Sequence, residues 1–537
     1  MAEKNKGSTL AKQGAILAIA ALIVRFIGFV YRVPLTRMIG DDGNGLYSTA
    51  YQIYTFFFIL SSAGIPIAVS KMVAEKIALK QYGNAHKIFQ VAIILCSITG
   101  GVASLILWFG GSWISQWLKS PRSVYSLQML APTLFIVAIM GALRGYFQGM
   151  NTMVPTAVSQ IIEQLFNAIS SVLLASWLMP RGVEYGAAGG TLGTGIGALG
   201  GLFFLLLLYL PARPKFMRRI KKFAHQEAKI SFSTILYDML HLALPIIVGT
   251  AILSVTNLID LSMVHRGLSF LRYEEKRIAQ LYGILTGKYV VLTTLPISLA
   301  TALATAAVPS ISASVVRAEK EALENKINLA LRFTMLLATP AAIGLMVLAD
   351  PVLMMLFPNQ AEGGLLLKIG SISIVFFALA QISTALLQGL GKVYVPVKNS
   401  LFSSILKILG NLVFIYLFDL NVVGVVISTN LFALMVCVLD LRDVIKETNI
   451  PLNYGFIFVK PVIASSIMGI FCFVFYKIML WGTHQNTFAT VGSIILSVLV
   501  YFSILLGIQG ITKEEIEMFP LGKKILMSME KRGFLKV

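Results

Sequence analysis

The chain has 537 residues, of which 57% are hydrophobic and only 13% are charged. A soluble protein carries roughly a quarter charged residues, so this composition excludes an ordinary soluble domain. The net charge of +20 would suggest a nucleic-acid partner in a soluble protein, but the placement of the basic residues, described below, excludes that partner.

Apolar runs of about 20 residues, the length that crosses a bilayer as a helix, recur along the whole chain. They predict an all-α integral membrane protein with about fourteen transmembrane helices. Sustained apolar runs, in place of short alternating segments, exclude an outer-membrane barrel. In chain order the predicted spans are 13–35, 46–70, 88–110, 124–143, 154–179, 186–210, 235–258, 279–309, 330–349, 365–388, 399–418, 422–440, 457–479 and 488–508.

Basic residues gather in every second segment between these spans. With a cytoplasmic N-terminus, the inside segments hold about 28 Lys and Arg and the outside segments about 8, which is the asymmetry that sets membrane topology. The densest patch is residues 212–229, and such a patch between two spans is typical of contact with anionic lipid headgroups. We therefore expect a multi-pass protein of the cytoplasmic membrane with both termini in the cytoplasm.

The sequence contains traces of an internal repeat. Leu46-Tyr47 recurs as Leu281-Tyr282, and Gln148-Gly149 followed by a proline recurs as Gln388-Gly389 followed by a proline. The offsets of about 235 and 240 residues predict two parallel lobes, a common arrangement in transporters. We expect an N-terminal lobe at 1–210, a basic cytoplasmic linker at 211–234, a C-terminal lobe at 235–440, and two further helices with a tail at 441–537.

Several ionisable side chains fall inside predicted spans, where a charge is expensive unless it faces a cavity or a partner. Arg25 lies in the middle of the first span, with Arg32 two turns later, while Lys288 and Lys407 lie deep in the eighth and eleventh. Each arginine could instead be satisfied by helix carbonyls or extend to the membrane surface.

Two carboxylates complete the set of candidate site residues. Glu163 lies in the fifth span, where it could be protonated, pair with a cation or take part in proton coupling. Asp260 ends the seventh predicted span and could pair with Arg32 or Lys288, or be an ordinary helix-end aspartate. The deep cations Arg25, Lys288 and Lys407 outnumber the one deep anion, so a cavity that they line would favour an anionic substrate. Arginine suits phosphate because its planar group bonds two oxygens at once.

Motifs for other classes of function are missing from the sequence. It contains no GxxxxGK[ST] nucleotide loop, no HExxH and no GxSxG. The histidines and acidic residues do not have metal-ligand spacing, and the three cysteines fall inside predicted spans. We expect neither an enzyme nor a cofactor, although transport could be coupled to the membrane potential or to a monovalent cation.

Three stretches resemble a known family: RFIGFVYRVPLTRMIGDDGNGLY (25–47), GIPIAVSKMVAE (64–75) and RGYFQGMNTMVPTAVSQIIEQ (144–164). They look like the multidrug/oligosaccharidyl-lipid/polysaccharide exporter superfamily, and within it the branch of lipid II flippases and stage V sporulation protein B. The resemblance implies alternating access of two lobes and a substrate linked to undecaprenyl diphosphate. It also implies cavity arginines for the diphosphate and a lipid-tail groove along 457–508.

The chain matches this family pattern only in part. Arg25 takes the place of the first-span arginine, but the next one would fall at about Tyr31, adjacent to Arg32. The second-span arginine has no counterpart, and Lys288 stands about one turn from the position of the eighth-span arginine.

The leading hypothesis is a monomeric flippase for a cell-wall precursor such as lipid II, with a role in peptidoglycan synthesis or sporulation. Three alternatives stay open. One is export of another lipid-linked polysaccharide unit. Another is a drug exporter, which the cationic bias disfavours. The third is a membrane glycosyltransferase or polymerase acting on the same lipid, which the short outer loops disfavour.

Overall fold

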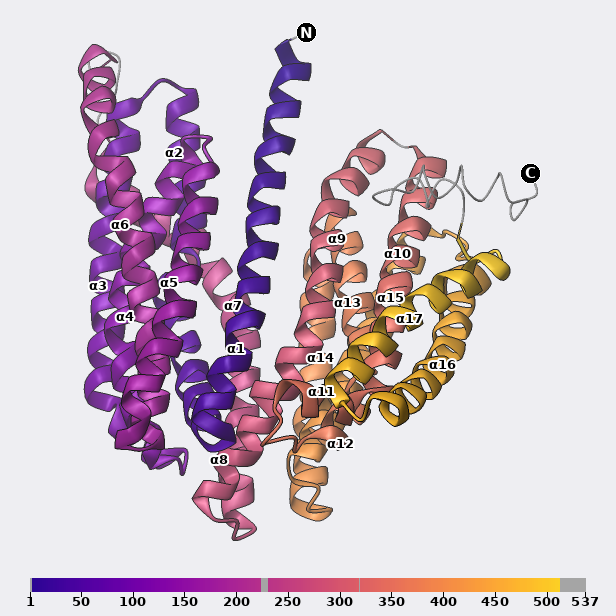
Figure 1. The fold of residues 1–537 in the computed structure, drawn as a ribbon. Helices are drawn as coiled ribbons and strands as arrows, with labels where there is room; N and C mark the ends of the chain where they lie inside the picture. The colour runs from indigo at the N-terminus through magenta and orange to yellow at the C-terminus, as the bar shows by residue number, and fades with distance from the viewer. Residues whose placement is uncertain (1, 224–229, 318, 512–537) are drawn as a thin grey trace. The chain divides into compact units, whose positions relative to one another are not determined.

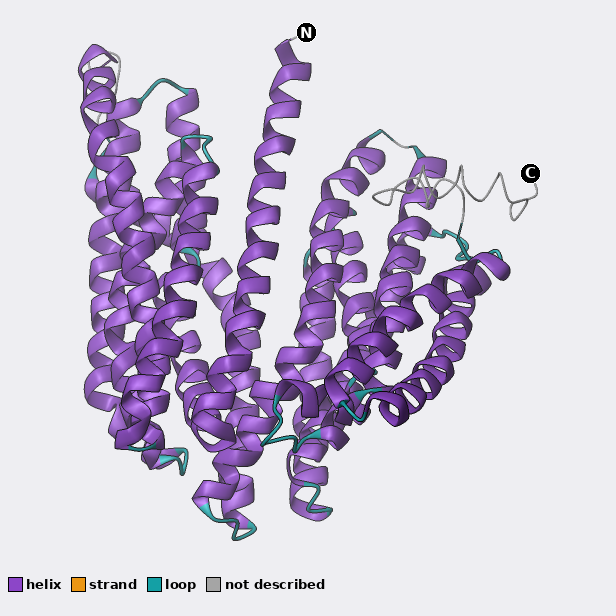
Figure 2. Ribbon diagram, in the orientation of Figure 1, coloured by secondary structure: helices purple, strands orange, loops and turns teal. Residues whose placement is uncertain are grey.

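The computed structural model describes residues 2–223, 230–317 and 319–511, and within these ranges the chain is helical with no strand (Figure 2). Residues 224–229 of the predicted basic linker and 512–537 of the predicted tail lie outside the described ranges. Membrane helices satisfy every backbone N–H and C=O internally, which the hydrocarbon core requires. Because the described ranges are helical and contain no strand, the all-α fold class predicted from the sequence is confirmed.

The chain divides into two compact units. The first comprises Met1–Ser298 and Ser400–Phe432, and the second comprises Leu299–Asn399 and Ala433–Val537. The predicted boundaries at 210, 234 and 440 stay predictions.

The helices up to Ser298 belong to the first unit (Figure 1). They are α1 (Ala2–Ser62), α2 (Ile65–Ala78), α3 (Tyr82–Trp117), η1 (Pro121–Ser123), α4 (Val124–Gly149), α5 (Val154–Leu178), η2 (Met179–Arg181), α6 (Val183–Phe223), α7 (Phe232–Phe270), α8 (Glu275–Ile284), the π-helical turn η4 (Leu285–Tyr289) and the start of α9 (Val290–Val316). The later segment of this unit adds most of α14 (Tyr394–Asn411), the π-helical η5 (Leu412–Leu417) and the start of α15 (Asn421–Thr448).

The second unit holds the remaining helices. Besides its parts of α9, α14 and α15, these are α10 (Lys320–Val347), α11 (Ala349–Leu356), α12 (Gly364–Gly370), α13 (Ser373–Gly389), η6 (Gly455–Val459), α16 (Lys460–Thr483) and α17 (Asn486–Gly507).

Twelve of the described helices are long and apolar enough to cross a membrane, and the bent pair α12–α13 makes a thirteenth. The first candidate, Ile19–Ala78, contains the break in α1 at Gly40. The count of twelve to thirteen candidates is close to the expected number of about fourteen spans.

Gly40 breaks α1 because its backbone angles, φ 72° and ψ 178°, belong to a region that only glycine occupies readily. Figure 1 shows α1 descending from the N-terminus and α2, which starts at Ile65, back at the upper level, so the chain reverses near this break. The carboxylates Asp41 and Asp42 follow Gly40 directly and therefore lie at this reversal.

One predicted loop is wrong. The sequence predicted a loop at 259–278, but α7 stays helical to Phe270 and α8 begins at Glu275. Asp260 therefore lies inside α7 and does not end it. The polar residues after Asp260 ended the apolar run, although the backbone continues as a helix beyond it.

Helices α5 and α6 approach closely along a row of glycines. A Cβ added to Gly189 would lie 2.5 Å from the Leu174 carbonyl oxygen, and one added to Gly197 would lie 2.5 Å from the Glu163 carbonyl oxygen. Small residues at such intervals allow membrane helix backbones to approach one another. The Gly-rich run 186–201 is therefore a packing surface.

The repeat predicted from Gln148-Gly149 and Gln388-Gly389 extends to the hydrogen bonds of both turns. In the first unit, the Asn151 N–H donates to the Gln148 carbonyl; in the second, the Gly391 N–H donates to the Gln388 carbonyl. Asn151 and Gly391 both have left-handed backbones, with φ of 58° and 80°. The same helix-ending turn thus recurs at an offset of 240 residues.

Replacing Gly189 with alanine tests the close packing of α5 on α6. Because the added methyl group would meet backbone atoms of Leu174 and Ala175, we expect Gly189→Ala to destabilise the protein by about 1–3 kcal/mol. The matched control is Gly249→Ala in α7, where an added Cβ meets nothing within 4 Å. Thermal unfolding in detergent should show a lowered midpoint for Gly189→Ala only, and equal midpoints for both variants would contradict the packing.

Candidate functional site

All six candidate residues predicted from the sequence belong to the first unit. They come from five separate helical segments: Arg25 and Arg32 from α1, Glu163 from α5, Asp260 from α7, Lys288 from η4 and Lys407 from α14.

Lys288 forms a buried ion pair with Asp41. Its side chain is only 1% exposed, and its ammonium group lies 2.8 Å from the carboxylate of Asp41, which is 12% exposed. The pair joins η4 to the reversal in α1. An ammonium group at this depth would be costly without such a partner.

The segment around this ion pair is closely packed. The Asn44 side-chain amide donates to the Gly283 carbonyl at 2.8 Å. A Cβ on Gly283 would collide with the Asp41 carbonyl oxygen, and one on Gly45 would collide with the Ala279 carbonyl oxygen. Glycines on both helices therefore bring the second part of α1 against α8 and place Asp41 within reach of Lys288.

Lys407 pairs with Asp260, and Asp260 pairs with neither Arg32 nor Lys288. The Lys407 ammonium and the Asn411 side-chain amide both donate to the Asp260 carboxylate, the amide at 2.7 Å. Lys407 also lies 5.7 Å from the centre of the Phe432 ring. Because Lys407 and Asn411 are one turn apart on α14, both side chains can reach the same carboxylate of α7.

Glu163 pairs with Arg144, a residue that the sequence analysis placed in an inside segment. The guanidinium of Arg144 lies 2.7 Å from the Glu163 carboxylate, and its Nε donates to the Ser159 hydroxyl at 2.9 Å. Arg144 belongs to the last turns of α4, which continues to Gly149. The predicted end of that span at residue 143 concealed this partner.

A further cluster that the sequence analysis missed surrounds Arg122 in η1. Its guanidinium makes two parallel hydrogen bonds to Asp42, at 3.0 and 2.8 Å, and its Nε donates to Glu184 at 2.6 Å. The Arg122 backbone N–H also donates to Glu275 at 3.4 Å. One arginine thus ties η1 to the reversal in α1 and to the starts of α6 and α8.

Arg32 is surrounded by tyrosines. Its guanidinium carbon lies 6.0 Å from the ring centres of both Tyr47 and Tyr51. Tyr47 and Tyr51 stack at 5.9 Å, and Tyr54 lies 5.7 Å from Tyr51. Cation–π contacts at this range orient an arginine without neutralising its charge.

Arg25 and Arg32 differ from the other four candidate residues in having no ion-pair partner among the described residues. The Arg25 side chain is exposed and that of Arg32 is partly exposed. One turn from Arg25, a Cβ on Gly28 would lie 3.3 Å from the Gln164 amide nitrogen, which places this face of α1 near α5.

The charge balance expected from the sequence therefore changes. Both deep lysines are paired with carboxylates, and Glu163 is paired with an arginine. Of the four candidate cations, the two arginines of α1 are those without a carboxylate partner among the described residues. Within the described residues, no group of three His, Cys, Asp or Glu side chains could hold a metal ion. A role of the six candidates in substrate binding stays a prediction.

Comparison with known proteins places the chain in a family. The family model described as "Polysaccharide biosynthesis protein" matches residues 10–315, which is more than half of the chain. The chain belongs to this polysaccharide biosynthesis family. It is a multi-pass membrane protein with the exporter-superfamily fold, and the resemblance predicted from its first 165 residues is confirmed.

Two similar family members come from Bacillus subtilis (strain 168). Stage V sporulation protein B is 27% identical over 97% of this chain and 99% of its own length, and "Lipid II flippase MurJ" is 27% identical over 79% of this chain and 80% of its own.

Solved structures show the same fold. One is described as "Lipid II flippase MurJ, inward closed conformation", with a TM-score of 0.68 at 17% identity over 91% of this chain and 98% of its own. Another is an inward-facing multidrug resistance MATE family transporter of the MOP superfamily. Its TM-score is 0.67 at 14% identity, over 80% of this chain and 94% of its own.

A double-mutant cycle tests the buried ion pair of this family member. Asp41→Asn leaves the Lys288 ammonium buried without its carboxylate, so we expect a loss of about 3–5 kcal/mol in stability. The double variant Asp41→Asn/Lys288→Met should recover a large part of that loss. The measurement is unfolding of the full chain in detergent.

The exposed pair Lys368–Asp350 provides the control for this cycle. Its side chains are 46% and 45% exposed, so Lys368→Met should change stability by less than about 1 kcal/mol. A double variant no more stable than Asp41→Asn alone would show that burial of the unpaired lysine is not the cause.

Proposed function

We propose that this protein is a flippase that moves an undecaprenyl-diphosphate-linked cell-wall precursor, lipid II, between the leaflets of the cytoplasmic membrane. Its membership of the polysaccharide biosynthesis family supports this function, as do relatives named lipid II flippase and stage V sporulation protein B. The fold common to exporters of the MOP superfamily supports transport by alternating access.

The observation that carries the proposal is the state of the two arginines in α1. Arg32 is partly exposed, is held by tyrosines and has no ion-pair partner within the described residues. A guanidinium group in this state can bond two phosphate oxygens at once. Arg25 lies two turns earlier on the same helix, so the two cations suit a diphosphate.

The energetic problem of flipping is the polar headgroup. Each polar group that loses water without gaining a hydrogen bond costs on the order of 2–7 kcal/mol in hydrocarbon. In our proposal, the arginines and the hydroxyl of the partly exposed Tyr51 replace that water around the diphosphate and the first sugar. The polyprenyl tail needs no such replacement and stays in the lipid.

The four other candidate residues keep the helices around the arginines in place. Lys288 with Asp41 holds η4 to α1, and Lys407 with Asp260 holds α14 to α7. Glu163 with Arg144 holds α5 to α4.

Energy for directional transport would come from the membrane. Moving one elementary charge through a potential of 100 mV releases about 2.3 kcal/mol, and the cargo diphosphate is charged. Coupling to the potential, or to a monovalent cation, is therefore part of the proposal. The protein would act as a monomer, without a cofactor.

The proposal contains no covalent step. A glycosyltransferase or polymerase that uses the same lipid would need acid or base residues on a sizeable loop outside the membrane. Between helices that the structure describes in full, the longest link is residues 357–363. The second candidate function is transport of another lipid-linked polysaccharide unit, which the family's description favours.

A vesicle translocation assay with labelled lipid II tests the function. Losing one charge-assisted contact of about 1.5–3 kcal/mol should lower cargo affinity roughly 10- to 100-fold, so Arg25→Ala and Arg32→Ala should both translocate slowly at limiting cargo. The control is Arg181→Ala, whose guanidinium lies on the Trp177 ring, 5.5 Å from its centre.

The outcomes of this assay separate the two functions. Normal translocation by a folded Arg32→Ala protein would remove the diphosphate site from the proposal. Wild-type protein that ignores lipid II and moves another undecaprenyl-linked glycan would favour the second candidate function.

The proposed orientation has its own test. The positive-inside asymmetry puts the repeated turns, Asn151 and Gly391, on the cytoplasmic side together with the N-terminus. Single cysteines at these positions, in a chain whose Cys96, Cys437 and Cys472 are replaced, should react with a membrane-impermeant maleimide only after the cells are opened. Labelling of either cysteine in intact cells would contradict this orientation.

A further inference from the structure

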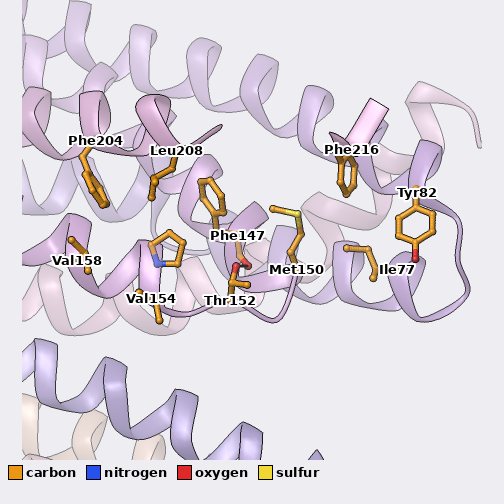
Figure 3. Close-up of a pocket in the computed structure, with 11 residues that line it drawn as sticks. Ile77, Tyr82, Phe147, Met150, Thr152, Val154, Val158, Phe204, Leu208 and Phe216 are labelled. Atoms are coloured by element: carbon orange, nitrogen blue, oxygen red, sulfur yellow. Dashed lines mark hydrogen bonds between the residues drawn. The ribbon is translucent and has the colours of Figure 1, made fainter. Parts of the chain in front are cut away.

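Residues of the first unit line an apolar pocket of about 700 Å³, and neither Arg25 nor Arg32 is among them. Figure 3 shows its walls: Phe204 and Leu208 from α6, Val154 and Val158 from α5, and Phe147 from α4. Among the described side chains that line it, only Tyr82 and Thr152 carry a polar group.

The pocket exists because the glycine row between α5 and α6 ends. Up to Gly201 the two helices are in close contact, since a Cβ on Gly201 would lie 3.3 Å from the Ser159 carbonyl oxygen. Beyond it, α6 carries the larger residues Phe204 and Leu208, which line the pocket. A wedge-shaped opening at this point follows directly from the change from small to large residues.

The length and the apolar lining of the pocket suit the acyl chain of a lipid. From Phe204 to Phe216, its lining residues extend over twelve positions of α6, or about 18 Å, which is roughly half the thickness of the hydrocarbon core. A pocket with so few polar groups does not hold ordered water well. An acyl chain of the adjacent leaflet fits both its length and its apolar walls.

One end of the pocket is surrounded by basic residues. Phe216 lies between Arg213 and Arg218, both exposed on α6. Arg213 interacts electrostatically with His86, whose ring centre is 6.2 Å from that of Phe216. The exposed Lys80 follows just beyond the end of α2, three positions after the pocket residue Ile77.

We propose that this pocket is a binding site for one anionic glycerophospholipid of the membrane leaflet at the basic end of α6. One acyl chain occupies the space between α5 and α6, and the headgroup phosphate is bound by Arg213 and Arg218. Basic residues at the end of an apolar cleft between membrane helices recognise anionic headgroups in this manner. The lipid fills the opening that the end of the glycine row creates.

The same features favour a resident phospholipid over the polyprenyl cargo. The pocket is lined by α2 to α6 and includes no residue of α1, whereas the arginines proposed for the cargo diphosphate are both in α1. A site for a structural lipid can be occupied throughout transport, because it shares no residue with the cargo site.

Native mass spectrometry of the full chain tests this site by titration with palmitoyl-oleoyl phosphatidylglycerol and, separately, with phosphatidylcholine. We expect one tightly retained phosphatidylglycerol, and an affinity for phosphatidylcholine that is roughly thirtyfold lower, as two cations worth ~1 kcal/mol each imply. Arg213→Gln/Arg218→Gln should reduce the affinity for phosphatidylglycerol to that for phosphatidylcholine.

Val158→Trp fills the pocket and should lower the affinity for both phospholipids at least tenfold. Its matched control is Leu207→Trp, an equally large side chain on an exposed position of α6 outside the pocket. The double arginine variant changes only exposed side chains, so it keeps the test valid should Val158→Trp fold poorly.

Three results would overturn the proposal. In the first, Val158→Trp binds phosphatidylglycerol as tightly as the wild type does. In the second, the native protein binds the two phospholipids with equal affinity. In the third, an equimolar amount of undecaprenyl diphosphate displaces the bound phosphatidylglycerol. The last result would assign the pocket to cargo.

Discussion

Placing a charged side chain between membrane helices costs several kcal/mol unless a partner neutralises it, and the first unit is organised around this constraint. Lys288 pairs with Asp41, and Lys407 pairs with Asp260. Each pair joins helical segments that are distant in the sequence, so neutralising the charge also fixes the packing of α1 against η4 and of α7 against α14. The glycine contacts between α1 and α8 serve the same arrangement, because they bring Asp41 within reach of its lysine.

This pairing changes what the unit can offer to a substrate. A carboxylate partner cancels most of the attraction that a lysine would exert on another anion. Arg32 is held by tyrosine rings and keeps its positive charge. The candidate site for an anionic cargo is therefore narrower than a cavity lined by every deep cation. It consists of one face of α1, with the tyrosines of the second part of the same helix beside Arg32.

The sequence predicted the helices well because membrane insertion depends on local apolar runs. It also predicted the repeated turn, since Gln148-Gly149 and Gln388-Gly389 end their helices with equivalent hydrogen bonds. It could not predict the ion pairs, because their partners lie far apart in the chain: Lys288 and Asp41 are separated by 247 positions. Hydropathy also ended several helices early, α4 and α7 among them, because polar residues at a helix end lower the apolar score without breaking the backbone. That error misplaced Asp260 and concealed Arg144 as a partner of Glu163.

The role of the α1 arginines is tested most directly by equilibrium binding of an undecaprenyl-diphosphate-linked glycan to the full chain in lipid nanodiscs. If the arginines of α1 hold the cargo, Arg25→Gln/Arg32→Gln lowers affinity on the order of a hundredfold or more. Asp41→Asn/Lys288→Met, which removes a buried pair without changing the net charge, then leaves affinity within a few-fold of wild type. Unchanged affinity in the arginine variant, or a comparable loss in the variant without the buried pair, would contradict the claim that the arginines of α1 hold the cargo.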